Sequence, residues 1–262
     1  MTASRRAGAG SPLPTLRALA RVASTAWHLL RGIATVGLRW PHVDGPRRES
    51  HVAAWSRGLI GAMGLRLVVH GQPRPGAALV VANHVSWLDI AALHAVMPGA
   101  RFVAQAGIRR WPLIGWLVGA VGTLFIERER KRDALRVVHR VAESLATGDK
   151  VVVFPEGATG NGRELLPFHA NLLQAAIATA VPLQPVALRY ADARGACSAS
   201  VDWTGDLSLL GSVWSIARAD GLQVVVDLLS PVATQHADRR ALARHVQSII
   251  AARLAQAPTV QE

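Results

Sequence analysis

Residues 77–89 read AALVVANHVSWLD, and this stretch decides the fold. Its continuous apolar run, rich in valine, is typical of a strand buried on both faces of a parallel sheet. The run ends at Asn83 and His84, where the pattern changes from strand to helix. Loops at the carboxyl ends of such strands commonly carry the chemistry of α/β proteins. His84 is therefore a candidate functional residue.

The rest of the chain repeats this alternation of short apolar runs and helical patterns. Besides 77–83, the predicted strands cover residues 66–70, 101–104, 123–126, 150–154, 184–190 and 223–229. The predicted helices cover residues 87–97, 112–120, 131–147, 167–180, 206–218 and 237–255. Strands separated by helices predict an α/β fold with a largely parallel sheet flanked by helices. We expect residues 65–262 to form this domain, with 191–205 as a surface excursion.

The chain is basic, and its charge is unevenly distributed. The 262 residues carry a net charge of +12 and are 50% hydrophobic, a composition that excludes a disordered chain. Residues 1–66 contain ten arginines and two acidic residues. Such an excess indicates an anionic partner, such as lipid headgroups, nucleic acid or an acidic carrier protein. Because the charge is clustered on a half-apolar segment, we expect no nucleic acid among the partners.

Residues 15–38 predict a long amphipathic helix with one polar and one apolar row of side chains. The polar row comprises Arg17, Arg21, Ser24, His28, Arg31, Thr35 and Arg39, and the apolar row comprises Leu19, Val22, Ala26, Leu29, Leu30 and Ile33. Arginines within the segment disfavour a membrane-spanning helix and favour one that lies in the interface of a bilayer. Two alternatives are an amphipathic helix packed on its own domain and a targeting peptide.

A second apolar helix is expected at 53–65, because Pro41 ends the first helix and residues 40–50 read as a polar connection. We therefore expect residues 1–64 to form a basic, membrane-associating helix pair. The predicted location is the cytoplasmic face of the inner membrane, with the protein peripheral or monotopic. The recurring arginines do not fit a secretory signal, so we expect an unprocessed chain. Cys197 is the single cysteine, which excludes an internal disulfide and a cysteine-based zinc site, and no metal is predicted.

His84 and Asp89 form a candidate general-base pair. A carboxylate bonded to one imidazole nitrogen fixes the tautomer and leaves the other nitrogen able to take a proton. An alternative is purely structural, because Ser86-Trp87-Leu88-Asp89 has the spacing of a helix capping box. The two roles are compatible if His84 lies just outside the helix and Asp89 lies in its first turn. No nucleophile elbow or phosphate-binding loop is present, so covalent catalysis is not predicted.

Three further stretches follow strand patterns. Gly122–Arg128 reads GTLFIER and delivers Arg128 at a strand end, where a guanidinium can hold a phosphate or carboxylate or form a surface salt bridge. Phe154-Pro155-Glu156-Gly157 places Glu156 at another strand end beside a flexible turn. Residues 181–186, VPLQPV, place two prolines around a strand start, which indicates a shaping element.

In this order and spacing, the four stretches resemble the blocks of the lysophospholipid acyltransferase family, the 1-acyl-glycerol-3-phosphate acyltransferases of bacterial membranes. The blocks are NH-x4-D, G-x2-FI-x-R, FPEG and VPxxPV, and the resemblance covers roughly residues 65–230. It implies the family's α/β domain behind an N-terminal membrane-binding helix pair. It also implies transfer of an acyl chain from acyl-CoA or acyl-carrier protein to lysophosphatidic acid (1-acylglycerol-3-phosphate), with no cofactor.

The resemblance also implies roles for individual residues. His84 would deprotonate the glycerol 2-hydroxyl, and Asp89 would orient and charge-stabilise that histidine. Arg128 would hold the acceptor phosphate. The other implied substrate-binding residues are Asn83, Glu156 and Gly157. Asn83 would support the turn around His84. Glu156 and Gly157 would shape the acceptor site by bonding to the glycerol or to neighbouring arginines.

The chain departs from the family pattern at several positions. Gln105 and His169 stand where lysines are common, and Ala158-Thr159-Gly160 follows the FPEG block in place of the usual threonine and polar residue. Loss of the two lysines weakens the expectation of a phosphate-bearing acceptor, although Arg101, Arg109 or Arg110 could compensate. The alternatives are therefore an O-acyltransferase for lyso-ornithine lipid or another lysolipid, and a non-catalytic protein that binds lipid or acyl carrier.

Overall fold

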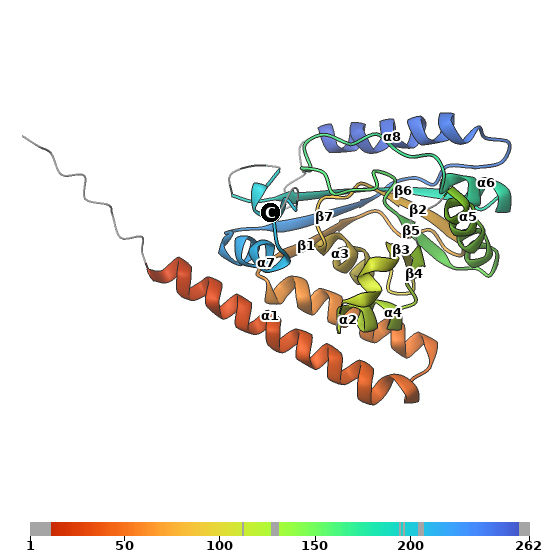
Figure 1. Cartoon of the computed structure of the whole chain (residues 1–262). Helices are drawn as coiled ribbons and strands as arrows, with labels where there is room; N and C mark the ends of the chain where they lie inside the picture. The colour runs from red at the N-terminus through yellow and green to blue at the C-terminus, as the bar shows by residue number, and fades with distance from the viewer. Residues whose placement is uncertain are drawn as a thin grey trace, which may run out of the picture.

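The computed structural model describes residues 12–256 apart from 112, 127–130, 194, 196 and 204–206. Within this part of the chain, seven strands form one sheet with the order β1-β7-β6-β2-β5-β3-β4 (Figure 1). The strands are β1 (Arg66–His70), β2 (Ala78–Ala82), β3 (Arg101–Gln105), β4 (Leu124–Ile126), β5 (Lys150–Val153), β6 (Leu183–Ala191) and β7 (Gln223–Leu228). All seven predicted strands are confirmed, and so is the α/β class.

The sheet is parallel except for one pair of strands. β6 and β7 run antiparallel, with Tyr190 opposite Val224, whereas the other adjacent strands run parallel. Every residue of β2 and β6 is buried, as the continuous apolar runs predict. Because β2, β5 and β3 are parallel neighbours, the segments that follow them leave the sheet at the same edge.

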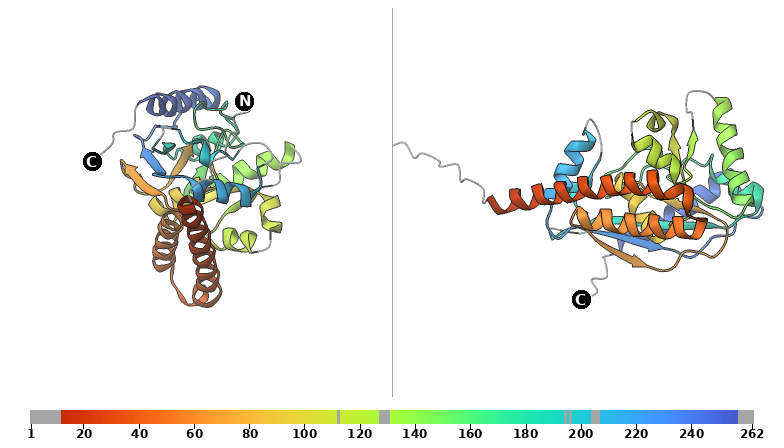
Figure 2. Two further views of the ribbon diagram at one scale, coloured as in Figure 1. Left: turned by 90° about the vertical axis from the view of Figure 1, so that its left-hand side faces the viewer. Right: turned by 90° about the horizontal axis from the view of Figure 1, so that it is seen from below.

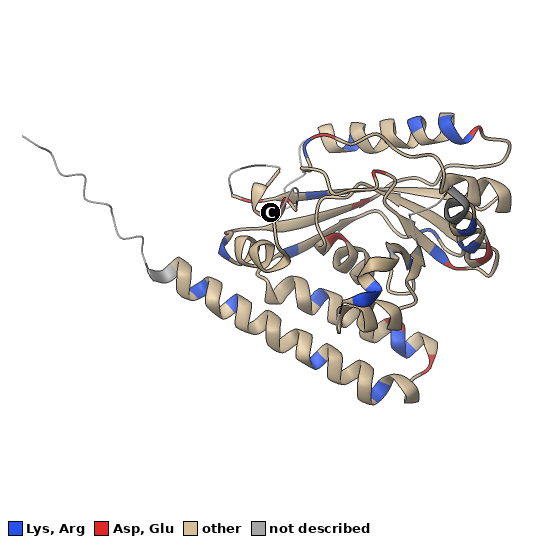
Figure 3. Cartoon of the chain, in the orientation of Figure 1, with Lys and Arg blue, Asp and Glu red and all other residues tan. Residues whose placement is uncertain are grey.

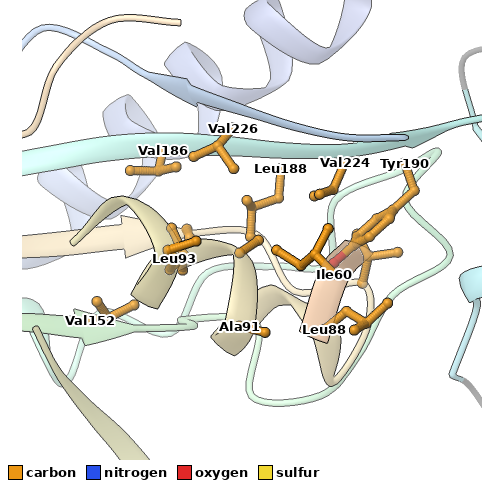
Figure 4. Packing of buried hydrophobic residues seen from close by; sticks show 14 of the residues in the cluster. Ile60, Leu88, Ala91, Leu93, Val152, Val186, Leu188, Tyr190, Val224 and Val226 are labelled. Atoms are coloured by element: carbon orange, nitrogen blue, oxygen red, sulfur yellow. The ribbon is translucent and has the colours of Figure 1, made fainter. Parts of the chain in front are cut away.

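Helices cover both faces of the sheet and bury a separate apolar cluster on each. They are α1 (Pro12–Arg39), α2 (Gly45–Ala62), α3 (Leu88–Val96), α4 (Ile114–Ala120), α5 (Lys131–Ala146), α6 (Leu173–Thr179), α7 (Leu209–Arg218) and α8 (Arg239–Ala255), with short 3-10 helices η1 (Trp40–His42), η2 (Ala106–Arg110) and η3 (Ala199–Val201). On one face, Ile60 of α2 and Leu93 of α3 pack with Val226 (Figure 4). On the other face, α5, α6 and α8 cover Leu79 and Val81 of β2.

Two predicted helix boundaries are wrong. α2 begins at Gly45 and not near residue 53, because Asp44 caps it by accepting a hydrogen bond from the backbone N–H of Arg47 at 3.0 Å. The polar connection therefore shrinks to residues 40–44. α6 begins at Leu173 and not at 167, because the N–H of His169 donates to the carbonyl of Pro155 and ties this segment to the loop after β5.

The long helix α1 packs on the domain through part of its predicted polar row. The guanidinium of Arg21 donates to the carbonyls of Ala217 and Ala219, and Nε2 of His28 lies 2.7 Å from the carbonyl of Trp55. With α2 it forms a hairpin that projects from one side of the molecule (Figure 2). The helix pair of 1–64 therefore exists over its described residues, although its separation from 65–262 as a unit stays a prediction.

The apolar surface of α1 is left open. Leu16, Trp27, Leu30 and Leu38 have exposed fractions of 61%, 64%, 58% and 75%. Arginines are spaced along the same helix, with few acidic residues nearby (Figure 3). Within the predicted apolar row, Leu19, Leu29 and Leu30 are 51%, 38% and 58% exposed, so this row is not buried against the core of the domain. None of the helices within the described ranges is long and apolar enough to cross a membrane.

Candidate active site

The strand β2 delivers Asn83 and His84 to the carboxyl edge of the sheet. Asn83 is buried and pairs with the backbone of β6: its Oδ1 accepts from the N–H of Leu188 at 2.7 Å, and its Nδ2 donates to the Leu188 carbonyl at 2.9 Å. The amide side chain of Asn83 thus takes the place of the next backbone–backbone hydrogen bonds between β2 and β6. The backbone of β2 is released at this point, and the chain turns towards α3.

His84 and Asp89 are in direct contact. Nδ1 of His84 lies 2.8 Å from Oδ2 of Asp89, and Asp89 is fully buried in the first turn of α3. The same oxygen accepts the backbone N–H groups of Val85 at 2.7 Å and Ser86 at 3.0 Å. The capping geometry and the pair with the imidazole therefore coexist on one carboxylate oxygen. Because Oδ2 of Asp89 is a hydrogen-bond acceptor, Nδ1 is assigned as the imidazole nitrogen that carries the proton and donates to it.

The other carboxylate oxygen is bound by Tyr190, a residue that the sequence analysis did not identify. Tyr190 lies in β6, and its hydroxyl donates to Oδ1 of Asp89 at 2.7 Å. Burial raises the pKa of this phenol well above its ordinary value, and the negative charge of Asp89 and their hydrogen bond raise it further. A phenol with a raised pKa is protonated at neutral pH, so Tyr190 acts as a hydrogen-bond donor to Asp89. It is the sole tyrosine of the chain.

Glu156 holds the backbone of His84. Its Oε1 accepts from the His84 N–H at 2.7 Å, its Oε2 accepts from the Leu166 N–H at 2.8 Å, and its side chain is buried. Burial raises the pKa of this carboxyl, and the two backbone N–H groups oppose the rise. The N–H of Gly160 donates to the His84 carbonyl at 2.7 Å. Glu156 thus links the backbone at His84, through Oε1, to the loop after β5 at Leu166, through Oε2.

Phe154 and Gly157 shape the same loop. The ring of Phe154 stacks on the imidazole of His84, with centroids 4.1 Å apart and planes 16° apart, which fixes the plane of the histidine. Gly157 has φ +74°, a conformation that side chains with a Cβ rarely adopt, and its N–H donates to the carbonyl of Phe154. The turn after β5 therefore needs a glycine at this position.

The remaining nitrogen of His84 is positioned for proton transfer. No described residue hydrogen-bonds to Nε2, and the side chain is 19% exposed. An imidazole whose Nδ1 faces a carboxylate, and whose Nε2 has no hydrogen-bond partner among the described residues, can act as a general base. Within the described ranges, no group of three or more His, Cys, Asp or Glu side chains is arranged to hold a metal ion.

The basic residues expected near an acceptor lie in different places. Arg128 lies outside the described residues. Arg101 begins β3 at the opposite edge of the sheet from His84 and pairs with Asp149, with Nε 2.9 Å from Oδ2, so it cannot compensate for a missing lysine. Arg109 and Arg110 follow β3 at the same edge as His84, and both are exposed.

Comparisons with known proteins show which family and which fold this chain resembles. The family model described as acyltransferase matches residues 66–189. A lyso-ornithine lipid O-acyltransferase of Pseudomonas aeruginosa is 38% identical, over 81% of this chain and 81% of that protein. A 1-acyl-sn-glycerol-3-phosphate acyltransferase of Neisseria meningitidis is 38% identical, over 80% of this chain and 84% of that protein. The crystal structure of the acyltransferase PlsC from Thermotoga maritima shares the fold with a TM-score of 0.69 at 19% identity, covering 92% of this chain and 96% of that one.

Proposed function

This chain belongs to the acyltransferase family, as a glycerolipid or lysolipid acyltransferase, and from that premise we propose that it acylates the 2-hydroxyl of lysophosphatidic acid to form phosphatidic acid. The acyl donor is a thioester, acyl-CoA or acyl-carrier protein, and the scheme uses no cofactor. The observation that carries the proposal is the His84–Asp89 pair, with Nδ1 2.8 Å from Oδ2 and Nε2 without a partner among the described residues.

The chemistry needs one base and no covalent intermediate. Nε2 of His84 takes the proton of the acceptor hydroxyl as its oxygen attacks the thioester carbonyl. The new ester C–O bond forms, the C–S bond breaks, and the thiolate leaves with the proton that His84 had accepted. Asp89 stabilises the imidazolium in between, and Tyr190 and the N–H groups of Val85 and Ser86 hold Asp89.

Acceptor binding is assigned to the groups around this base. From the resemblance, Arg128 holds the acceptor phosphate, and Gly157 lets the loop after β5 approach the acceptor closely. Asn83 and Glu156 serve the acceptor site indirectly, since their described contacts are to the backbone of Leu188, His84 and Leu166. The exposed Arg109 and Arg110 follow β3 at the same end of the sheet as His84, where they can attract an anionic acceptor or donor.

The proposed location is the cytoplasmic face of the inner membrane, with the protein peripheral or monotopic. The open apolar surface of α1, formed by Leu16, Trp27, Leu30 and Leu38, fits the acyl boundary of an anionic bilayer, and the arginines of the helix fit the headgroups. Docking of this kind brings the lipid acceptor to the site and excludes water, which would otherwise hydrolyse the thioester.

A second candidate acceptor is lyso-ornithine lipid. It is favoured by the name of the Pseudomonas relative and, from the family resemblance, by Gln105 and His169, which stand where lysines suited to a phosphate monoester are common. A lyso-ornithine acceptor presents a carboxylate and an amine in place of the phosphate.

One experiment separates the candidates. Purified protein in anionic vesicles receives labelled acyl-CoA or acyl-carrier protein together with equal amounts of lysophosphatidic acid, lyso-ornithine lipid and lysophosphatidylcholine. We expect labelled phosphatidic acid to form fastest. Faster acylation of lyso-ornithine lipid would replace the proposed acceptor, and absence of turnover with every donor and acceptor would favour a non-catalytic binding protein.

A further inference from the structure

The segment between β3 and β4 carries an open apolar surface of its own. Trp111, Leu113, Ile114 and Trp116 have exposed fractions of 44%, 57%, 37% and 48%, and we call these four side chains the α4 surface. Exposed large apolar side chains gathered within a few residues are unusual on a soluble surface and mark an interaction site. The amphipathic pattern of α1 does not account for them, because they belong to a different part of the chain.

We propose that the α4 surface inserts into the interface of an anionic bilayer beside α1, as a second membrane-docking element that sets the orientation of the active site. The inference rests on the proposed docking of α1. Its partner is a lipid surface, because tryptophans flanked by arginines are the side chains that prefer the headgroup boundary. Arg109 and Arg110 directly precede the surface, and both are exposed.

The position of the segment supports this partner. Trp40, which directly follows α1, donates from Nε1 to the carbonyl of Ala120 at 3.1 Å, and a Cβ built on Gly37 would lie 3.8 Å from the ring of Trp116. The α4 surface is therefore continuous with the end of α1 that carries the exposed Leu38. Figure 1 places α4 on the same side of the sheet as α1 and α2, away from α8.

The same segment adjoins the catalytic edge of the sheet. β3 is a parallel neighbour of β5, whose carboxyl end leads to Glu156, and η2 begins directly after Gln105. The guanidinium of Arg109 lies 5.9 Å from the centroid of Phe125 in β4, which holds the segment against the sheet. A bilayer that contacts the α4 surface therefore lies close to the carboxyl ends of the parallel strands, where His84 is located.

The backbone of the segment suits a lipid environment. The N–H of Trp111 donates to the Ile108 carbonyl, that of Gly115 to Trp111, and that of Leu117 to Leu113, at 2.9 to 3.0 Å. Internal hydrogen bonds of this kind allow a backbone to enter an apolar phase. Leu113 adopts φ +63°, which is strained for leucine, while its side chain stays 57% exposed. Contact with lipid would supply the burial that the protein itself does not give this side chain.

The test uses single-cysteine reporters in the full chain. Cys197→Ser removes the native thiol, and cysteines replace Leu113 on the α4 surface, Leu30 on α1 or Leu135 on α5, which is a matched control at 74% exposure. Each variant carries a polarity-sensitive fluorophore and is mixed with vesicles of phosphatidylglycerol and phosphatidylethanolamine. Aqueous iodide then measures how far lipid shields each label.

We expect vesicles to shift the emission of the fluorophores at positions 113 and 30 to the blue and to protect both from quenching by iodide. The fluorophore at position 135 should remain fully quenched by iodide. Shielding at Leu30 without shielding at Leu113 overturns the inference and leaves the docking of α1 intact. An open label at Leu30 overturns that docking itself. Shielding at Leu113 that needs no vesicles and grows with protein concentration also overturns the inference, because a second copy then covers the surface.

A charge variant gives an independent readout. Arg110→Gln should lower partitioning onto the anionic vesicles by about fivefold, the effect of one basic residue near a charged membrane surface. Arg244→Gln on α8 removes an exposed arginine from the far side of the sheet and should leave partitioning unchanged. Equal losses in the two variants would indicate general electrostatic attraction and would contradict a localised docking surface.

Discussion

The hydroxyl of Tyr190 lies 2.7 Å from Oδ1 of Asp89, and among the described residues it is the sole donor to that oxygen. The other oxygen, Oδ2, is shared by His84 and two backbone N–H groups. The basicity of His84 therefore depends on a residue of β6, one strand away from the loop that carries the histidine and aspartate. If His84 is the base, as proposed, Tyr190 acts as a positioning residue, since its contact is with Asp89 and not with the reacting atoms.

Removal of this hydroxyl should change the pH dependence of the reaction. Tyr190→Phe takes a hydrogen bond from the anionic pair and so raises the proton affinity of His84 and Asp89 together. We expect the acid limb of kcat/KM to move to higher pH by about one unit, from the usual strength of a hydrogen bond to a charged group. Rates measured between pH 5 and 9 would show the shift as a loss at low pH that recovers at high pH.

A purely structural role for Tyr190 would give a different result. The variant would then lose activity by the same factor at every pH, with the acid limb unmoved. The state of Tyr190 can also be followed by NMR. Because the chain has one tyrosine, wild-type protein with 13C-labelled tyrosine gives a single ring signal, which comes from Tyr190.

Glu156 offers a second test of how the catalytic loop is held. In Glu156→Gln, one of the two backbone N–H groups, of His84 or Leu166, faces an amide NH2 and loses its acceptor. An unsatisfied buried N–H costs about 1–3 kcal/mol, and we expect unfolding in urea to show a loss in this range together with reduced kcat. Glu164→Gln, an exposed change in the same loop, is the control. Full activity and stability in Glu156→Gln would contradict the positioning role.

His94 should make the protein sensitive to acid. Burial lowers the pKa of this histidine to about 4 from an ordinary value of 6.5. The unfolded chain therefore binds a proton at His94 between pH 6.5 and 4 that the folded protein does not, so stability falls as the pH is lowered through this range. The loss amounts to roughly 3 kcal/mol when complete.

The variant His94→Leu isolates that contribution. Urea unfolding at several pH values should show a shallower fall in the free energy of unfolding between pH 6.5 and 4 than in the wild type. Parallel curves for the two proteins would show that His94 is not the group responsible.

Membrane docking by α1 gives a prediction that does not depend on catalysis. Leu30→Glu places a charge on the open apolar surface and should reduce binding to phosphatidylglycerol vesicles in a flotation assay by about tenfold or more, because a charged group in the acyl boundary costs well over 1.4 kcal/mol. Leu135→Glu on α5 introduces the same charge at a leucine that is 74% exposed, against 58% for Leu30, and that lies away from α1. Equal flotation of both variants would contradict the proposed orientation of the helix.

Much of the fold could be predicted because the strands are continuous apolar runs. β2 and β5 lie in the middle of the sheet, where burial on both faces selects valine, and this pattern is visible in the sequence. The start of α2 was predicted wrongly, near residue 53, although Asp44 and Pro46 are ordinary signals of a helix start at Gly45. The antiparallel direction of β7 could not be predicted, because it depends on the connection through α7 and not on composition.

The candidate site was predictable only in part. His84 and Asp89 are five residues apart, so their contact follows from a local turn between strand and helix. Tyr190 is 101 residues from Asp89 and stands in an apolar strand, where a tyrosine looks like an ordinary core residue. Its one available signal was that it is the single tyrosine of the chain. The backbone role of Glu156 was likewise hidden, because a sequence does not say which N–H groups a carboxylate will face.

The central claim is that His84 is the base that activates the acceptor hydroxyl, and His84→Ala tests it most directly. Acyl transfer from a labelled thioester to the acceptor selected by the lysolipid panel is measured in a single turnover, with His245→Ala on α8 as the control for loss of an exposed histidine. We predict that His84→Ala keeps its fold by circular dichroism and loses about 10²–10⁴-fold in rate. A folded His84→Ala protein that transfers the acyl chain at the wild-type rate would contradict the account.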